Sequence, residues 1–422
     1  MNKVPNLRFN NFNDEWQEHV LGDIFEFYTT NSFSRDFLDN DNGSVKNIHY
    51  GDIHMKFPTL LDVKNTQIPY VKETVDLSKI SIESYCKNGD VVIADASEDY
   101  NDIGKAIELQ SVGEEKVIAG LHTILARDNK GIMVNGFRGY LMTSPNVRKQ
   151  IKVYAAGAKV LGISKANISK VNLLIPSSME QEKIASFFSL IDKKIELQTE
   201  KVEELKNYKK GIMQKIFSQQ LRFKDEDGNE YPEWARKHLS QFVQRVTRKN
   251  KGLVSTLPLT ISAQYGLVDQ ESFFNKTVAS NNLEGYYLLE NGEFAYNKSY
   301  SNGYPWGTVK RLDKYKCGVL SSLYICFNPN IDINSNYLVH YFESTKWHKE
   351  IAMIAVEGAR NHGLLNISIS DFFDTLHYIP SREEQDKIAV CLSAIDKKIY
   401  KEQEKLDALV DYKKGLLQQM FV

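Results

Sequence analysis

Cationic, amide and aromatic side chains are interleaved in residues 296–311 of this 422-residue chain. Amides can donate to and accept from base edges, cations can neutralise phosphates, and rings offer packing surfaces. The combination favours contact with nucleic acid, and a solvated turn is the alternative for the segment taken alone. The candidate contact residues are Asn297, Lys298, Tyr300, Asn302, Tyr304, Trp306, Lys310 and Arg311.

Two further segments extend this candidate interface. The loop-like stretch 245–251 is suited to phosphate contact. Residues 94–105, which occupy the equivalent position in the first half to 296–311, are rich in carboxylates that can accept from cytosine but repel phosphate. Equivalent segments with different chemistry predict recognition of two different targets. The additional candidates are Arg245, Arg248, Lys249 and Lys251, and, in the first half, Tyr100, Asn101 and Lys105.

A glycine-alanine-cation pattern also occurs twice, as G-A-K-x-x-G at 157–162 and G-A-R-x-x-G at 358–363. The glycines can supply a positive φ in a turn, with the cation incidental. The equally open alternative is a phosphate clamp formed by Lys159 and Arg360.

Residues for catalysis or metal binding form no recognisable pattern. The sequence has no phosphate-binding loop of the G-x-x-x-x-G-K-[ST] type, no G-x-S-x-G and no H-E-x-x-H. Its four cysteines include no C-x-x-C, which disfavours a zinc ribbon or a redox pair. The nine histidines are scattered, and a lone one such as His122, in an apolar run, is interpreted as a core residue. We therefore expect a non-catalytic chain that binds no metal or other cofactor.

The chain contains an internal duplication. Residues 176–217 and 380–421 align without a gap, and 22 of 42 positions are identical. Fainter matches precede them, including L-R-F at 7–9 and 221–223. The expected domains are 1–175, 176–218, 219–379 and 380–422, of which the second and fourth are the repeated segments.

The repeated segments predict two long helices. Apolar residues recur at alternating four- and three-residue steps, as in a coiled-coil seam. Each helix would run about 38 residues, or roughly 57 Å, and unrelated amphipathic helices on separate cores are the alternative. The predicted seam consists of Ile184, Phe188, Ile191, Ile195, Val202, Leu205, Ile212 and Ile216, and of Ile388, Leu392, Ile395, Ile399, Leu406, Leu409, Leu416 and Met420.

Polar residues interrupt the seam at equivalent places. If the helices pair antiparallel about a pseudo-two-fold axis, Gln198 and Glu402 would form a polar layer that specifies register. Lys209 and Lys413 are expected to extend towards solvent. At the start of each helix, a serine followed by Glu180 or Glu384 predicts a capping box.

The divergent segments are expected to be α+β globules. Apolar runs at 91–94, 121–125 and 323–327 predict strands, and helices are expected near 136–155 and 336–355. The net charge is −1, so no global basic field indicates a nucleic-acid partner, although one face can still be basic. The absence of an apolar N-terminal segment or a spanning run predicts a cytoplasmic protein with no membrane partner.

Two variable globules, each followed by a near-identical long helix, resemble the specificity (S) subunit of type I restriction–modification systems. The resemblance is carried by N-I-H-Y-G-D-I-H at 47–54, A-G-L-H-T at 119–123, G-A-R-N-H-G-L-L-N-I-S at 358–368 and I-P-S-x-x-E-Q-x-K-I-A opening each helix. It implies target recognition domains that each read half of a split site on double-stranded DNA, with an antiparallel coiled coil between them.

The resemblance also implies partners: two methyltransferase (M) subunits, and restriction/translocase (R) subunits in the full complex. S-adenosylmethionine, ATP and magnesium would belong to those partner subunits. A bivalent scaffold for protein interactions, and a methyltransferase or nuclease with an undetected site, are the alternative functions.

Overall fold

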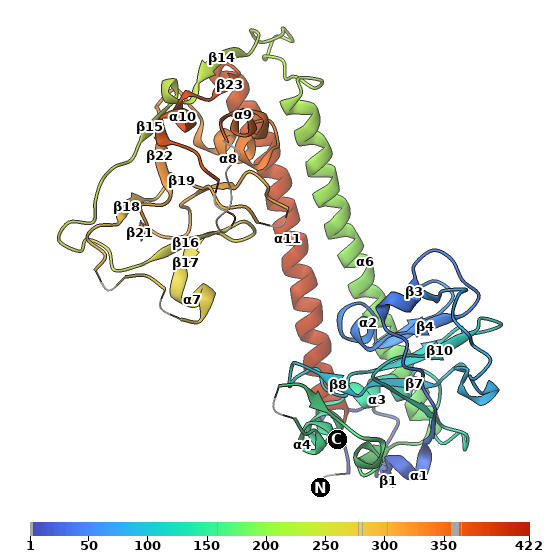
Figure 1. The fold of residues 1–422 in the computed structure, drawn as a ribbon. Coiled ribbons are helices and arrows are strands. Elements are labelled where there is room, and N and C mark those ends of the chain that lie inside the picture. Colours follow the sequence, from blue (N-terminus) through green and yellow to red (C-terminus); the bar gives the residue numbers. More distant parts are fainter. Residues whose placement is uncertain are drawn as a thin grey trace. The chain divides into compact units, whose positions relative to one another are not determined.

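The computed structural model describes residues 3–157, 159–276, 278–280, 282–301, 303–355, 363 and 365–422. The chain divides into two compact units: unit 1 is Met1–Glu200 with Glu404–Val422, and unit 2 is Lys201–Gln403. Each unit therefore combines one globule with part of each of two long helices, α6 (Ser178–Phe217) and α11 (Arg382–Met420) (Figure 1).

The two long helices pack together antiparallel. In unit 1, the ring of Phe188 near the start of α6 lies 5.9 Å from that of Phe421, just after the end of α11. In unit 2, Ile216 near the end of α6 shares a core with Ile388 near the start of α11. With 40 and 39 residues, the helices are about 60 Å long at 1.5 Å per residue. The α+β fold with paired long helices is confirmed.

The predicted seam faces inward, because each of its sixteen apolar residues is buried or half-buried. Glu402 is also buried, and its carboxylate lies 3.0 Å from the ammonium of Lys201. The polar layer of Gln198 and Glu402 stays a prediction.

The expectation for Lys209 and Lys413 was wrong. Lys209 Nζ lies 2.6 Å from Asp396 Oδ1, and Lys413 Nζ lies 2.5 Å from Asp192 Oδ1. Their side chains are only 13% and 18% exposed. A carboxylate on the facing helix meets each ammonium before it reaches solvent, and the sequence pattern did not include that partner.

The globule of unit 1 contains a mixed five-stranded sheet in the order β2-β11-β7-β9-β5 and a four-stranded sheet in the order β10-β4-β6-β3. Two-stranded sheets join β1 to β13 and β12 to β8. The strands are β1 (Gln17–Val20), β2 (Glu26–Tyr28), β3 (Leu38–Asp39), β4 (Lys46–Ile48), β5 (Leu60–Asp62), β6 (Tyr70–Val71), β7 (Val91–Ala94), β8 (Ala96–Ser97), β9 (Ala106–Gln110), β10 (Val117–Ala119), β11 (Thr123–Arg127), β12 (Leu161–Gly162) and β13 (Asn172–Ile175).

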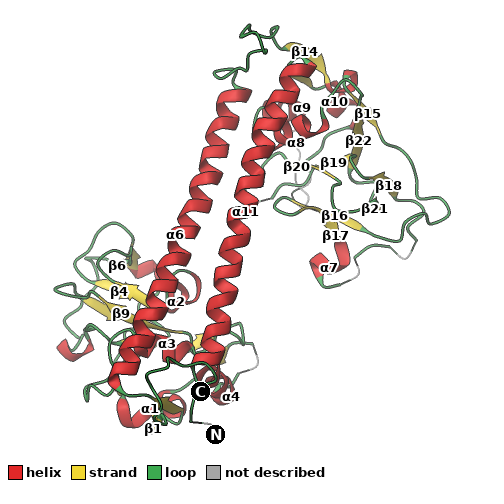
Figure 2. Cartoon of the chain, turned by 180° about the vertical axis from the view of Figure 1, so that it is seen from behind, coloured by secondary structure: helices red, strands yellow, loops and turns green. Residues whose placement is uncertain are grey.

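The globule of unit 2 repeats the central part of this topology. Its four-stranded sheet has the order β15-β22-β19-β20, which matches β2-β11-β7-β9 strand for strand along the chain. Three two-stranded sheets pair β14 with β23 (Figure 1), and β16 with β17 and β18 with β21 (Figure 2). The strands are β14 (Ala235–His238), β15 (Val243–Arg245), β16 (Leu259–Ser262), β17 (Gly266–Asp269), β18 (Tyr287–Glu290), β19 (Phe294–Asn297), β20 (Thr308–Arg311), β21 (Cys317–Leu320), β22 (Ile325–Pro329) and β23 (Leu376–Ile379).

Each helix expected in a globule is in fact two shorter helices. Pro145 cannot donate a backbone hydrogen bond, so one helix ends at Thr143 and the next begins with the proline. In unit 2, the hydroxyl of Ser344 donates to the carbonyl of Tyr341 and ends the first helix. The short helices are α1 (Leu21–Ile24), α2 (Tyr50–Met55), α3 (Phe137–Thr143), α4 (Pro145–Tyr154), α5 (Lys165–Ile168), α7 (Gln270–Phe274), α8 (Ser335–Glu343), α9 (His348–Ile354) and α10 (Ile369–Asp374), with single 3-10 turns at Arg35–Phe37, Ile82–Ser84 and Leu239–Gln241.

Candidate nucleic-acid interface

A buried ion pair attaches each globule's N-terminal segment to a long helix. Arg8 donates from Nε and Nη2 to the two carboxylate oxygens of Glu180, at 2.8 and 2.7 Å. Arg222 binds Glu384 in the same two-pronged way, at 3.2 and 2.7 Å. The glutamates are therefore anchors for arginine. At α11 the serine half of the expected capping box is present, since Ser381 Oγ accepts from the backbone N–H of Glu384 at 3.3 Å. The glutamate half was wrong, because each carboxylate turns towards the stronger cationic donor.

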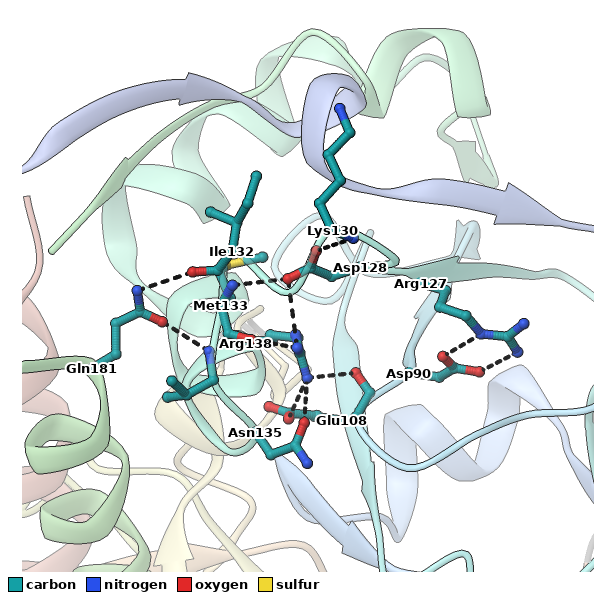
Figure 3. Close-up of polar contacts among 12 residues, drawn as sticks. Asp90, Glu108, Arg127, Asp128, Lys130, Ile132, Met133, Asn135, Arg138 and Gln181 are labelled. Atoms are coloured by element: carbon teal, nitrogen blue, oxygen red, sulfur yellow. Dashed lines mark hydrogen bonds and ion pairs between the residues drawn. The ribbon is translucent and has the colours of Figure 1, made fainter. Parts of the chain in front are cut away.

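A glutamine fixes the next part of each globule to the same helix. Gln181 accepts from the backbone N–H of Val134 at 2.9 Å, and its amide donates to the carbonyl of Ile132 (Figure 3). Gln385 accepts in the same way from the backbone N–H of Asn334. These contacts hold the start of α3 and of α8, so the repeated E-Q dipeptide positions two successive segments of each globule.

A buried polar network stiffens the first globule around α3 (Figure 3). Glu108 accepts from the backbone N–H groups of Gly136 and Gly139, at 2.6 and 2.8 Å, where the helix N-terminus favours negative charge. Burial raises the pKa of Glu108, although those N–H groups and Arg138 lower it. Arg138 also contacts Asp128 at 3.5 Å. The central sheet and α3 are thereby linked through one carboxylate.

In unit 2, the candidate segment 296–311 borders an open hollow of about 420 Å³. The opposite wall is the hairpin of β16 and β17, whose turn carries the exposed Gln264 and Tyr265. Asn297 and Tyr304 are the sequence candidates that the structure brings to this hollow. Gln264 and Tyr265 in the turn, and Phe273 in α7, were missed, because a short turn and a five-residue helix carry no sequence signal for a shared hollow.

The other candidates of 296–311 are placed differently. The ammonium of Lys298 donates to the carbonyl of Ile367 at 3.1 Å, and Arg311 donates to side chains at the N-terminus of α8. Lys310 is half-buried, and burial lowers its pKa against the influence of Glu343. Tyr300 is exposed and Trp306 half-buried, whereas Asn302 and Arg360 lie outside the described residues.

Three of the four cations of 245–251 contact other side chains or carbonyl groups, and the fourth is exposed. Arg248 lies 2.8 Å from Glu293, and Lys249 donates to the carbonyl of Gly285 while its ammonium lies over the ring of Tyr287. Arg245 contacts the hydroxyl of the same tyrosine at 3.4 Å. Lys251 is exposed at the tip of the stretch and is best placed for a phosphate.

In unit 1, the three candidates of 94–105 surround the loop after β7. Tyr100 is exposed with Lys152 over its ring, and Asn101 accepts from the same lysine at 2.9 Å. Lys105 is half-buried and donates to the carbonyl of His54. Lys159 is exposed, some way along the chain.

Beside this loop lies a cluster of imidazole rings that the sequence did not reveal. The ring of Tyr50 is 4.7 Å from that of His49 and 5.3 Å from that of His122. His122 is therefore no core residue: its side chain is 51% exposed, its φ is +53°, and it lies 3.3 Å from Asp95. Burial raises the pKa of Asp95, against the influence of His122. Imidazole and carboxylate together can donate to and accept from base edges.

The two surfaces therefore differ in chemistry although equivalent strands carry them. Unit 1 presents the imidazole of His122 and the carboxylate of Asp95 beside the end of β7, whereas unit 2 presents amides and tyrosines near the end of β19. Both are suited to contact with base edges.

One family model and two solved structures are similar to this chain. Residues 13–207 match the family described as type I restriction modification DNA specificity domain. The S subunit of a type I restriction-modification system from M. genitalium is similar in structure, with a TM-score of 0.54 and 12% identity over 99% of both chains. A chain from a structure of type I R-M complex assembly and conformational transition has a TM-score of 0.54 and 11% identity over 96% of this chain and 97% of its own.

Among the described residues, every helix is too short or too polar to cross a bilayer.

Proposed function

Residues 13–207 carry a type I restriction modification DNA specificity domain, and we propose that the whole chain is the specificity subunit of such a system. Each globule reads one half of a bipartite, asymmetric DNA site. The chain thereby directs methyltransferase and restriction subunits to that site.

The observation that carries this proposal is the pairing of a repeated scaffold with divergent surfaces. The central strand order, the arginine–glutamate anchor and the glutamine contacts recur in both globules. The surfaces at the ends of β7 and β19 share no such likeness. A protein that presents different polar groups from one scaffold is suited to reading two unlike sequences.

The two long helices carry the same residues at equivalent positions, and these residues could each bind one copy of the same partner. Tyr208 and Tyr412 occupy equivalent positions and are 58% and 57% exposed. One turn further on, Gly211 and Gly415 lie inside helices, where a Cβ would meet no atom of the described chain within 4 Å. Glycine costs a helix about 1 kcal/mol relative to alanine. The fold of this chain does not itself require glycine at these two positions. Close approach of a partner's backbone to each helix would explain why the less stable glycine is present there.

Catalysis is assigned to those partners. We propose two methyltransferase subunits that bind S-adenosylmethionine, and restriction subunits that use ATP and magnesium, with all components in the cytoplasm. The chain itself would then hold no cofactor for either reaction.

The experiment is to map methylated adenines in cells that express the chain with its methyltransferase partner. A second strain carries a chain in which residues 24–160 are replaced by the corresponding globule of a relative. We expect the exchange to alter one half of the methylated motif and leave the other unchanged. Methylation that does not depend on the chain would contradict the proposal. A chain that binds its partners without affecting DNA methylation would instead be an interaction scaffold.

A further inference from the structure

Four ionisable side chains converge where α8 meets the long helices in unit 2. Glu343 from α8, Asp396 from α11 and Lys209 from α6 form an ion-paired triad, with Lys209 Nζ 2.8 Å from Glu343 Oε2 and 2.6 Å from Asp396 Oδ1. His340, one turn before Glu343, completes the cluster. Ligand atoms of His340, Glu343 and Asp396 all lie within 4.8 Å of one another.

The imidazole of His340 has a buried nitrogen that points into this cluster. The residue is 3% exposed, and Nδ1 has no hydrogen-bond partner among the described residues. Nδ1 lies 3.6 Å from Glu343 Oε2 and 3.7 Å from Asp396 Oδ2, which is too far for a hydrogen bond. A buried polar atom that is left unsatisfied in this way destabilises the fold, and its presence requires an explanation.

The far side of the imidazole is held in place. Nε2 lies 3.1 Å from the hydroxyl oxygen of Ser393 on α11. If Nε2 carries the proton and donates it to Ser393, the lone pair of Nδ1 faces the two carboxylates. This is how a metal-binding histidine is oriented by a hydrogen bond from its other nitrogen.

The geometry points to a divalent metal site formed by His340 Nδ1, Glu343 and Asp396, with zinc as the best-matched ion. Bonds of 2.0–2.1 Å to a tetrahedral zinc ion place neighbouring ligand atoms about 3.4 Å apart. The two separations of 3.6 and 3.7 Å are close to that edge. One nitrogen and two carboxylate oxygens suit zinc, and water completes the tetrahedron.

The ammonium of Lys209 binds the same two carboxylates that would bind the ion, so lysine and metal compete. The carboxylate of Glu343 already binds one cation, the ammonium of Lys209. Lys209 has a flexible side chain that can withdraw to solvent. Lys310 also faces the cluster, through its electrostatic interaction with Glu343.

Unit 1 contains the same arrangement with only one of the three metal ligands, Asp192 in place of Asp396. Gln181 and Gln385 contact Val134 and Asn334, and the same offset along the chain relates Tyr140 to His340. The hydroxyl of Tyr140 donates to Asp192 at 2.8 Å, and Asp192 pairs with Lys413. Thr143 stands where unit 2 has Glu343. The duplication therefore supplies a natural control, since a tyrosine at this position is compatible with the fold.

The test is calorimetric titration of the metal-stripped full chain with Zn²⁺, and absorption spectroscopy with Co²⁺. We expect one Zn²⁺ per chain, an absorption spectrum of tetrahedral Co²⁺ without thiolate bands, and a higher melting temperature in zinc. His340→Tyr, which copies unit 1, and Glu343→Gln should each weaken binding at least about tenfold, since even an outer hydrogen-bond partner contributes roughly 10–100-fold. Lys209→Met should bind zinc more tightly, because it removes the competing cation.

Circular dichroism of each metal-free variant checks that the fold is retained. Zinc binding by His340→Tyr that equals that of the parent, or no stoichiometric binding by the parent, would overturn the site. Lys209→Met that binds no more tightly than the parent would refute the competition between lysine and metal.

Discussion

Lys209 and Asp396 form an ion pair that the duplication repeats as Lys413 and Asp192. Each pair joins one long helix to the other, with a lysine from one repeat and an aspartate from the other. Because the duplicated positions exchange roles, each pair is the counterpart of the other in the duplication. The antiparallel register is therefore specified twice by the same two residue types.

The arginine anchors should contribute unequally to stability. Arg8→Ala leaves the carboxylate of Glu180, which is 1% exposed, without a cation, and we expect a loss of about 3 kcal/mol in the free energy of unfolding. Arg222→Ala should cost about 1–2 kcal/mol less than Arg8→Ala, because the carboxylate of Glu384 still accepts a hydrogen bond from the indole N–H of Trp234 at 3.0 Å. Urea denaturation measures both. Arg8→Ala combined with Glu180→Gln should recover part of the loss, and a larger effect of Arg222→Ala than of Arg8→Ala would refute the argument.

Acid should destabilise unit 2 through one buried histidine. Burial lowers the pKa of His377 from 6.5 to about 4, and the ring contacts Tyr341 and Thr375. Between these two values the unfolded chain binds the proton and the folded chain does not, so stability falls as pH falls, by up to about 3 kcal/mol. Urea denaturation from pH 7.5 to 4.5 should show this slope. His377→Gln should flatten it, and the control His19→Gln, at a half-buried histidine on β1 of unit 1, should not.

Discrimination at one half-site should depend on the hollow of unit 2. Asn297→Ala and Gln264→Ala should each relax the preference at a base by about 1–3 kcal/mol if a paired hydrogen bond is lost. The measurement is binding of the assembled complex to a set of duplexes with single substitutions. Lys298→Ala is the matched control, since its ammonium holds the carbonyl of Ile367. Unchanged discrimination in both hollow variants would assign the hollow to ordinary surface.

Lys251→Ala should weaken binding to all sequences alike. An exposed lysine that neutralises a phosphate contributes to affinity without reading a base. The slope of log affinity against log salt should decrease by about one phosphate contact. A change in sequence preference with an unaltered slope would show that this lysine reads a base.

The helices should set the length of the unread spacer between the half-sites. One extra heptad after Glu200 and another after Gln403 preserve the seam and lengthen both helices by about 10 Å. We expect the spacer to grow by up to about three base pairs, at 3.4 Å each, while both half-sites stay the same. Methylome sequencing reads out the new motif. An active insert with its former spacer would mean that the helices do not act as a ruler.

The long helices were predictable because a strong local pattern and a near-identical repeat both indicate them. The tertiary contacts could not be predicted from the sequence. These are the carboxylates that pair with Lys209 and Lys413, and the arginines that pair with Glu180 and Glu384. Strand positions followed from apolar runs, but the hairpin wall carrying Gln264 did not, since it lies far along the chain from Asn297. His122 was misjudged because an apolar run suggests burial even when the chain turns outward just before the strand.

The exchange of partners between the repeated ion pairs has an evolutionary consequence. A chain that ended after the first long helix would hold both members of the pair, Asp192 and Lys209, on one helix. Two such half-length chains could associate with their helices antiparallel about a true two-fold axis, with each aspartate meeting the lysine of the other copy. That ancestor would carry two identical globules and recognise a palindrome. Fusion of two copies into one gene would have freed the globules to diverge, and so turned a symmetric reader into an asymmetric one.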